Sequence, residues 1–414
     1  MKGDNMEKVY IVEAGRSPIG KFLGSLSEVN ATKLGAQVVG KIVERSGINA
    51  EEIDEFILGN VISSGLGQNP AKQVVIYSGL PDTIPAYSVN MVCASGIKAV
   101  ALAADSISSG NADTAIAGGT ESMSNAPFSM KGVRAFNKLG DIGLKQLMEK
   151  INERKASADE LVLIDEMINA GLWDCYNNLH MGALAEYIGE DYKISREQQD
   201  AFAMESHKRA AEASDTGKFK REIIPITTES GQVSTDEGIR RDTSMEKLSA
   251  LKPAFKDSGS VTAGNSSQLS DGASFLILMS EKRVKESKVK PLAEIEAFSF
   301  TGNNPKYYGM APVSAVKKLL DKTKMSIDDI DLVELNEAFC VQALGVINAL
   351  NMDIKKVNVN GGATALGHPI GATGARILTT LIYALHDRKK EIGLATLCHG
   401  GGGAAAMMIR RYNG

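Results

Sequence analysis

Two spacings of apolar residues recur along the chain. Short apolar runs such as VYIVEA (9–14), EFILGN (55–60) and DTAIAGG (113–119) predict buried strands. Between them lie stretches such as ATKLGAQVVGKIVERSG (31–47), whose apolar residues fall three or four positions apart, as on one face of a helix. The alternation of strand and helix predicts an α/β protein built around a buried sheet.

The two ends of the chain resemble each other. EEIDEFILGN (51–60) matches DDIDLVELNE (328–337), and CASGIKAVALAADSI (93–107) matches GATGARILTTLIYAL (371–385). Both matches are offset by nearly the same distance along the chain, which indicates a duplication. Two similar α/β halves are expected to pack together with a site between them.

A segment of about 150 residues (121–270) interrupts the repeat. It contains one clear helix (195–217), which starts with a capping box of Ser195 and Gln198 and stops at Gly217. A charged helical stretch (143–171) and a turn-rich stretch (237–255) flank that helix. We therefore divide the chain into an N-terminal half (1–120, completed by 271–290), an inserted loop domain (121–270) and a C-terminal half (291–414). An insertion beside the cleft is expected to cover a substrate or to form oligomer contacts.

Composition narrows the function. The 414-residue chain is 43% hydrophobic and carries a net charge of −4, which describes a globular protein and argues against a general nucleic-acid binder. Its four cysteines form no CxxC pair, so neither a zinc site nor a disulfide framework is predicted. The start lacks the apolar core of a signal peptide, and no run reaches the roughly 18 apolar residues of a membrane span. We expect a soluble, cytoplasmic protein.

Cys93 is the first candidate for chemistry. It lies in VNMVCASGIKAV, between an extended run and a predicted helix. Unpaired N–H groups and the positive end of the helix dipole at such a position are expected to lower the thiol pKa and favour a nucleophilic thiolate. The alternative is a small buried hydrophobic residue.

The C-terminal half holds the partners of this thiol. VNVNGGATALGHPIGATGAR (357–376) lacks the GK[ST] ending of a phosphate loop, and the glycines at 400–403 are followed by a strand-like run where a nucleotide site needs a helix. His368, held between glycine and proline, suits a base that takes a proton from a thiol. Cys398 precedes four glycines whose N–H groups suit an oxyanion hole. Asn336 either orients a water or caps a helix.

Several blocks in order make the chain resemble the thiolase family over nearly its full length, and within it the acetyl-CoA acetyltransferases. The resemblance implies a five-layered αβαβα core of two halves, with a loop domain that covers coenzyme A (CoA). The blocks are VNMVCASG (89–96), AGGTESMSNAP (117–127), NLHMG (178–182), VTAGNSSQLSDGA (261–273), NEAF (336–339), NGGATALGHPIGATGAR (360–376) and CHGGGG (398–403).

The resemblance also implies a mechanism. His368 deprotonates Cys93, which takes the acetyl group of a first acetyl-CoA. Cys398 then removes a proton from a second acetyl-CoA, and the carbanion attacks the acetyl-enzyme to give acetoacetyl-CoA; thiolysis is the reverse. One oxyanion hole is His368 with a water held by Asn336, and the other is the N–H groups of Cys93 and Gly400.

Further residues follow from the resemblance. CoA thioesters are substrates, no cofactor or metal is expected, and a homotetramer made of two dimers is implied. Tyr308 and Phe339 are expected to line the acyl pocket. Outside the site, His207 and His386 are expected to be solvated, and Cys175 and Cys340 to pack. The residues expected to bind CoA are Leu172, His180, Met181, Arg240, Phe255, Ala263 and Ser267.

The chain departs from the family pattern at three places. Tyr308 stands where many thiolases have a methionine, which predicts a shorter acyl pocket and a preference for acetyl groups. His399 follows Cys398 where the family often has isoleucine, valine or asparagine, and we expect its side chain to point away from that thiol. The charged stretch from about 143 to 161 is longer than usual for the loop domain.

Three other functions compete with this one. A degradative 3-ketoacyl-CoA thiolase of broader chain length would use the same residues. A decarboxylating ketosynthase would need a second histidine where Asn336 stands. A non-catalytic CoA-binding subunit would lack a catalytic group, yet Cys93, Asn336, His368 and Cys398 are all present.

Overall fold

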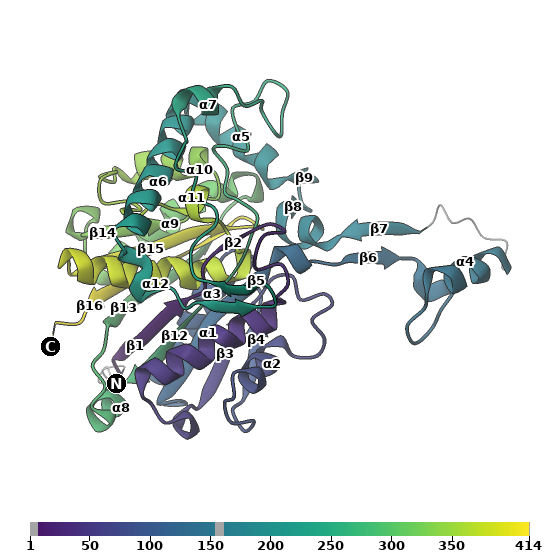
Figure 1. Ribbon diagram of the computed structural model, residues 1–414. Helices are drawn as coiled ribbons and strands as arrows, with labels where there is room; N and C mark the ends of the chain where they lie inside the picture. Colours follow the sequence, from purple (N-terminus) through teal and green to yellow (C-terminus); the bar gives the residue numbers. More distant parts are fainter. Residues whose placement is uncertain (1–6, 154–160, 414) are drawn as a thin grey trace.

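A single long sheet organises the protein. The computed structural model describes residues 7–153 and 161–413 (Figure 1). The strands follow the order β14-β15-β16-β13-β1-β12-β5-β3-β4, and the short β2 (Gly20–Lys21) pairs with β12. The bounds are β1 Val9–Arg16, β3 Glu55–Gly59, β4 Ala86–Val89, β5 Thr114–Ser122, β12 Ser270–Ser280, β13 Ala293–Gly302, β14 Leu332–Leu335, β15 Ile392–His399 and β16 Gly403–Arg411.

The strand pairing confirms the duplication. In the N-terminal half, β3 runs parallel to β5, and β12 runs antiparallel to both β5 and β1. In the C-terminal half, β14 runs parallel to β15, and β16 runs antiparallel to both β15 and β13. The halves join where β1 pairs with β13 at Tyr10–Glu294 and Ile11–Ala293.

The two halves of the sheet enclose the central helices between them and carry other helices on their outer faces, which gives the five layers that the family resemblance implies. In β1, Val9 and Ile11 pack toward the central helices α3 (Ser95–Ser108) and α12 (Ile370–Arg388), whereas Tyr10 and Val12 pack toward α1 (Ala31–Ser46) and α2 (Pro70–Tyr77). In the C-terminal half, α9 (Ala311–Thr323) and α10 (Cys340–Leu350) cover the outer face. This two-sided burial explains why the strands read as continuous apolar runs.

The central helices approach the strands closely because glycines lie at the contacts. A Cβ atom at Gly119 in β5 would lie 2.1 Å from the carbonyl oxygen of Gly371, and one at Gly96 would lie 2.8 Å from the backbone nitrogen of Ala375. A larger residue at either position would separate the two halves at this point.

The chain leaves the sheet after Ser122 and returns at Ser270. These ends lie together because Ser122 pairs with Asp271 across β5 and β12. Within the segment, α5 (Met181–Asp191) and α6 (Arg196–Asp215) pack on α10 and on α11 (Ala363–Leu366) of the C-terminal half. The predicted capping box at Ser195 starts α6 and the left-handed Gly217 follows its end, as predicted.

A hairpin arm projects from the body (Figure 1). It consists of β6 (Phe128–Lys131), α4 (Leu144–Glu153) near its tip and β7 (Val162–Asp165), which pairs antiparallel with β6. The prediction of one helical stretch over 143–171 is wrong for 162–165, because these residues complete the hairpin. Residues 154–160 of that stretch lie outside the described residues.

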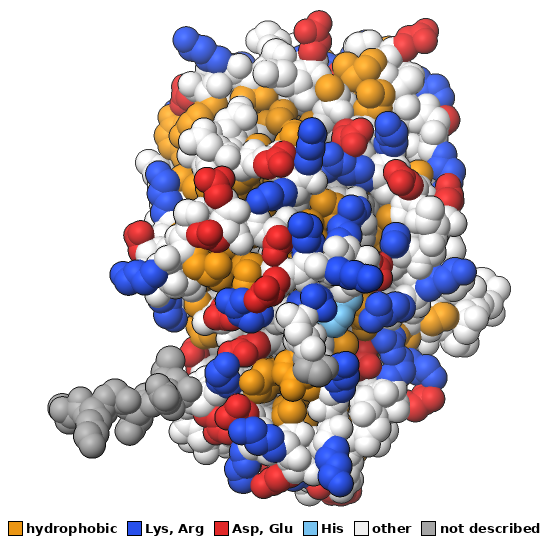
Figure 2. Space-filling view, turned by 90° about the vertical axis from the view of Figure 1, so that its left-hand side faces the viewer, with side chains coloured by type: hydrophobic (Ala, Val, Ile, Leu, Met, Phe, Trp, Pro, Cys, Tyr) orange, Lys and Arg blue, Asp and Glu red, His pale blue; other side chains and the backbone are white. Residues whose placement is uncertain are grey.

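The surface carries mixed charge. Figure 2 shows Lys and Arg side chains interspersed with Asp and Glu over one face of the molecule. Across the described residues, no helix combines the length and the apolar character needed to cross a membrane.

Other helical and strand segments complete the described fold. These are η1 Ala50–Glu52, η2 Met123–Asn125, η3 Val133–Ala135, η5 Ile168–Leu172, η6 Lys218–Arg221, η7 Pro305–Met310, η8 Ile327–Asp329, α7 Met245–Ser249, α8 Glu281–Ser287, β8 Trp173–Asp174, β9 Leu179–His180, β10 Ile226–Thr228 and β11 Gly231–Val233.

Candidate active site

Cys93 lies in a tight turn between β4 and α3. The preceding residue, Val92, adopts a left-handed conformation with φ of 47°, which is rare for a β-branched residue. The Ser95 hydroxyl accepts a hydrogen bond from the backbone N–H of Met91 (2.8 Å) and donates one to the carbonyl of Val92 (2.7 Å). These two bonds fix the turn and therefore the position of the Cys93 side chain.

His368 comes from the other half but lies at the same junction. It directly precedes α12, as Cys93 precedes α3, and the first turns of these helices are in contact through Gly96 and Gly371. Ile370 and Cys93 also belong to one apolar cluster. The structure thus gathers the predicted thiol and the predicted base where the halves meet.

The hydrogen bonds of His368 define its tautomer. Its Nδ1 lies 2.7 Å from Thr373 Oγ1, and that hydroxyl donates to the carbonyl oxygen of Pro369 (2.9 Å). Because the hydroxyl proton is used there, Nδ1 must donate and Nε2 keeps its lone pair. Burial, with a smaller effect from the positive charge of Arg376, lowers the pKa of His368 to about 3. The imidazole is therefore neutral at neutral pH and can accept a proton through Nε2.

Asn336 faces His368 from the end of β14. Its Nδ2 lies 3.5 Å from His368 Nε2, and its Oδ1 is buried without a hydrogen-bond partner among the described residues. A buried amide oxygen with a free lone pair suits a bound water or a polar substrate atom. The backbone of Asn336 bonds to Thr396 of β15, so the amide is held by the sheet and is not a helix cap.

Cys398 and Gly400 complete the group around Cys93. Cys398, in β15, is buried and interacts electrostatically with both Cys93 and Tyr308. The backbone of Gly400, in the turn from β15 to β16, lies near enough to the Cys93 thiol to lower its pKa. A backbone N–H near the sulfur is also suited to an oxyanion that would form on an acyl group attached there.

The expected low pKa of Cys93 is wrong. Burial raises the pKa of Cys93 to about 12, and the backbone N–H groups of Gly400 and of Cys93 itself offset this only in part. Burial also raises the pKa of Cys398. Removal from water costs a thiolate more than the helix start and these hydrogen bonds return. Both resting groups are thiols, so Cys93 depends on a base to become a nucleophile.

Several residues expected to bind CoA lie around the predicted acyl pocket. The His180 ring stacks on Phe255 (centroids 4.7 Å apart), and Phe255 meets Phe339 edge to face at 5.9 Å. Tyr308 is buried and donates a hydrogen bond from its hydroxyl to the carbonyl of Met181 (3.1 Å). These contacts join the loop segment to the C-terminal half.

The remaining residues of the CoA set are more scattered. Leu172 packs in the apolar cluster that includes Cys93, and the N–H of Ser267 donates to the carbonyl of Ala338. Ala263 is exposed. Arg240 lies on a cavity of about 250 Å³ over α6, together with Lys208 and Arg241. Three cations around one hollow suit an anionic group such as a phosphate.

The solvent-exposed environments predicted for His207 and His386 are wrong. His207 is buried, not solvated: its Nδ1 accepts the N–H of Arg240 (3.1 Å), and burial lowers the pKa of His207 to about 4. His386 is half-buried, with Nε2 2.8 Å from the carbonyl oxygen of Leu292. Both histidines contact other elements only in the folded chain. Their polar neighbours in the sequence therefore gave a wrong prediction of solvent exposure.

The two cysteines outside the site, Cys175 and Cys340, differ in burial. Cys175 is exposed, which contradicts its predicted packing role, whereas Cys340 is buried as predicted, with Sγ 3.4 Å from Thr364 Oγ1. His399 uses Nδ1 to donate to the carbonyl of Gly400 at 2.7 Å. It alternates with Cys398 along β15, and Cys398 packs in the cluster that α9 and α10 cover.

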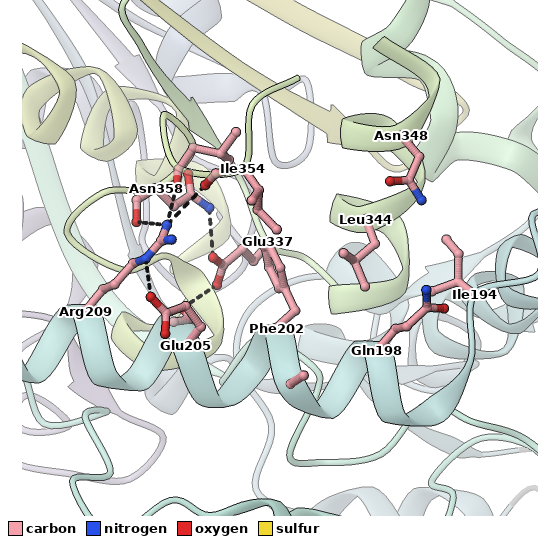
Figure 3. Close-up of a pocket in the computed structure, with 13 residues that line it drawn as sticks. Ile194, Gln198, Phe202, Glu205, Arg209, Glu337, Leu344, Asn348, Ile354 and Asn358 are labelled. Carbon is pink, nitrogen blue, oxygen red and sulfur yellow. Dashed lines mark hydrogen bonds and ion pairs between the residues drawn. The ribbon is translucent and has the colours of Figure 1, made fainter. Parts of the chain in front are cut away.

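A cavity of about 310 Å³ lies between α6 and α10 (Figure 3). Its buried carboxylate, Glu337, accepts hydrogen bonds from Asn358 (2.8 Å), from the Ser206 hydroxyl (2.8 Å) and from the Thr364 N–H (3.0 Å). These bonds tie the residue after Asn336 to three other segments and so hold the Asn336 backbone in place.

Thr373 and Glu121 are two residues at the site that the sequence did not single out. Thr373 follows His368 by five positions in GHPIGAT, and Glu121 lies in the block AGGTESMSNAP. Both residues therefore lie inside motifs that the sequence analysis had already identified. Their contacts with His368 and Gly371 arise only when the halves pack. In the described ranges, no group of three or more His, Cys, Asp or Glu side chains is placed to hold a metal ion.

A thiol, a neutral imidazole, a buried amide and a second thiol at the junction of two duplicated halves define an enzyme of acyl transfer. Family models described as "Thiolase, N-terminal domain" and "Thiolase, C-terminal domain" match residues 9–282 and 289–411. The chain belongs to the thiolase family and is an acyltransferase.

Relatives match over the whole length. The chain is 45% identical to an acetyl-CoA acetyltransferase of Allochromatium vinosum, covering 98% of this chain and 99% of that one. It is 44% identical to a probable acetyl-CoA acyltransferase of Staphylococcus aureus, covering 98% and 100%. The crystal structure of the Bacillus anthracis acetyl-CoA acetyltransferase superimposes with a TM-score of 0.90 at 40% identity, covering 98% and 99%.

Replacing Thr373 with valine tests the tautomer of His368. Without the hydroxyl acceptor, Nδ1–H loses its partner and the ring is free to expose either nitrogen. We therefore expect kcat for thiolysis to fall by at least about 10-fold, which is part of the roughly 10²–10⁴-fold that a general base contributes. Steady-state kinetics measure this. Thr379→Val on the same helix, which removes a buried hydroxyl bonded to Ser274, is the matched control. An unchanged kcat in Thr373→Val contradicts the assignment.

Proposed function

We propose that the protein is an acetyl-CoA C-acetyltransferase that condenses two acetyl-CoA molecules to acetoacetyl-CoA and CoA and catalyses the reverse thiolysis. The pairing of a half-buried thiol at the start of α3 with a buried thiol in β15 supports this most directly. One thiol can carry the acyl group while the other removes a proton from the second substrate. The names of the relatives point to the same reaction.

In the first half-reaction, the Cys93 proton passes to the free Nε2 of His368. The sulfur attacks the thioester carbon of acetyl-CoA, the carbon–sulfur bond to CoA breaks, and CoA leaves with the proton from His368. The N–H groups of Cys93 and Gly400 stabilise the oxyanion. Because the thiol pKa is raised and the histidine pKa is lowered, the pair stays uncharged until the substrate arrives.

In the second half-reaction, Cys398 passes its own proton to Nε2 of His368, and the resulting thiolate takes a proton from the methyl group of a second acetyl-CoA. The enolate oxygen lies at the protonated His368 and at Asn336, and the enolate carbon attacks the acetyl group on Cys93. Acetoacetyl-CoA forms, the bond from its carbonyl carbon to Cys93 breaks, and the Cys93 sulfur takes the proton from His368. A thioester α-proton is weakly acidic, so this step needs both the base and the stabilised enolate.

CoA is proposed to lie along the loop segment. The aromatic face of His180 and Phe255, with Leu172, Met181, Ala263 and Ser267, would contact the pantetheine, while Arg240 and its neighbouring cations would meet the phosphate-bearing end. No cofactor or metal is needed for these steps. The remaining candidates are a 3-ketoacyl-CoA thiolase of broader chain length and a non-catalytic CoA-binding subunit.

Tyr308 supports the short-chain choice. Its ring is buried beside Cys93 and Cys398, and the bond from its hydroxyl to Met181 holds it there. A fixed ring at this position leaves less depth for an acyl chain than the more flexible methionine would. Phe339 lies close by, across Phe255.

We also propose a homotetramer in the reducing cytoplasm. All four cysteines are free, which suits a reducing compartment. The arm carries five apolar side chains that are between 54% and 85% exposed: Phe128, Leu139, Leu144, Val162 and Leu163. An apolar surface on a projecting hairpin is suited to burial against a second copy.

Intact mass spectrometry tests the acyl-enzyme. Incubation with acetyl-CoA should add one acetyl group, mapped to Cys93 by peptide analysis, and Cys93→Ser should give no adduct. Cys398→Ser should still be acetylated but should not condense, because it lacks the base for the second step. No adduct on the wild-type protein would exclude the proposed mechanism and favour the CoA-binding subunit.

Chain length tests the role of Tyr308. The wild type should cleave acetoacetyl-CoA with a higher kcat/KM than a longer 3-ketoacyl-CoA, and Tyr308→Met should shift the ratio toward the longer substrate. One added methylene of room is worth roughly 10-fold in such discrimination. Tyr307→Met changes the neighbouring exposed tyrosine, which bonds to Asp191, and serves as the control. If Tyr308→Met leaves the ratio of the two kcat/KM values unchanged, Tyr308 does not limit the acyl chain length.

Light scattering tests the assembly. The wild type should have about four times the 44.1 kDa mass of the chain. Leu163→Glu should yield smaller species, because it places a charge on the apolar arm. Leu251→Glu, on the body, should leave the mass unchanged. A monomeric wild type, or a tetramer indifferent to Leu163→Glu, would show that the arm does not assemble the protein.

A further inference from the structure

Glu121 is a fully enclosed carboxylate at the junction of the halves. It lies near the end of β5 with no exposed surface. Its Oε1 accepts hydrogen bonds from Asn60 Nδ2 (3.0 Å) and the N–H of Ile62 (3.1 Å), and its Oε2 accepts the N–H groups of Val61 (3.0 Å) and Gly371 (2.9 Å). All four donors converge on one side chain.

We propose that Glu121 is a positioning residue for the proposed acyl transfer: its carboxylate fastens the end of α12 that follows His368 to the half that carries Cys93. The inference rests on the proposed function. Three of its four donors belong to the loop after β3 in the N-terminal half, and the fourth, Gly371, belongs to the first turn of α12 in the C-terminal half.

The connection to His368 is short. Gly371 is three residues beyond His368, and its N–H is one of the donors that a helix start leaves without a partner in the helix. A carboxylate there satisfies the donor and is favoured by the helix dipole. The fit is tight, because a Cβ atom on Gly371 would lie 2.7 Å from Glu121 Oε2 and 3.0 Å from the Asn60 Cα. A shift of the carboxylate therefore shifts the start of α12.

The same carboxylate acts on the thiol through its charge. Glu121 contributes to the raised pKa of Cys93, after burial, because a negative neighbour disfavours the thiolate. The other titratable groups that interact with Cys93 are Cys398 and Tyr308, which carry no charge at neutral pH. Asp271 on β12 faces Glu121, and burial raises the pKa of Glu121 to about 7. Removal of the Glu121 charge should lower the pKa of Cys93.

Two substitutions separate position from charge. Glu121→Asp keeps the charge but is one methylene too short to reach all four donors. Glu121→Gln keeps the length but places an NH₂ group against N–H donors and removes the charge. Asp271→Asn, which removes the charge of a nearby buried carboxylate bound by Ser122 and Ser124, is the control. Thiolysis kinetics and the pH dependence of Cys93 alkylation by iodoacetamide are the readouts, on variants shown to be folded by circular dichroism.

In Glu121→Asp we expect kcat to fall at least about 10-fold with KM nearly unchanged, since a misplaced base affects the chemical step, and the alkylation midpoint to stay at the wild-type pH. In Glu121→Gln we expect a similar fall in kcat together with an alkylation midpoint lower by about one pH unit. Asp271→Asn should lie closer to the wild type in both readouts. A purely structural role would not move the midpoint downward.

A wild-type kcat in Glu121→Asp would overturn the positioning role, and a midpoint that stays or rises in Glu121→Gln would overturn the electrostatic one. If Glu121→Gln does not fold, Gly371→Ala takes its place: the added Cβ displaces the carboxylate without changing charge, so kcat should fall while the midpoint stays, and an unchanged kcat would contradict the inference. Alkylation needs no acetyl-CoA, so failure of the proposed function, seen as a missing acetyl adduct, is recognised separately.

Discussion

The contact between the starts of α3 and α12 is the constraint on which the site depends. Gly96 in α3 lies against the backbone of α12, and Gly119 in β5 lies against the carbonyl of Gly371. Because no side chain separates these backbones, Cys93 and His368 can meet although they belong to different halves. The five layers, the duplication and the buried sheet all serve to bring these two helix ends together.

Burial then decides the chemistry of the gathered groups. In a poorly solvated site, charged forms are disfavoured, so the pKa of Cys93 rises to about 12 and that of His368 falls to about 3. The pair is neutral at rest, and in the proposed reaction charge develops only as the substrate reacts, beside Gly400 and Asn336. Thr373 and Glu121 hold the imidazole and its helix, so orientation compensates for the absence of a preformed thiolate.

The arrangement of the loop segment follows from the same sheet. Because β5 and β12 are neighbours, the segment leaves and returns at one point beside the catalytic residues, and α5 and α6 pack on α10 and α11 of the opposite half. Tyr308 bonds to Met181, and His180 stacks on Phe255. The segment is therefore anchored on the half that carries His368, Asn336 and Cys398.

Local pattern and repetition in the sequence determined the α/β class, the duplication, the main strands and the capping box of α6, because each is encoded in neighbouring residues or in repeated segments. The sequence motifs also predicted the catalytic residues, and their roles stay predictions. Only the tertiary structure decided the surroundings of these side chains. Four features depend on residues that are far apart in the chain: the raised pKa of Cys93, the His368 tautomer imposed by Thr373, the burial of His207 and the hydrogen bonds to Glu121. The strand over 162–165 depends on its partner β6. Desolvation and long-range hydrogen bonds exist only once the halves have packed, so the sequence named the reacting groups while the fold determined their protonation.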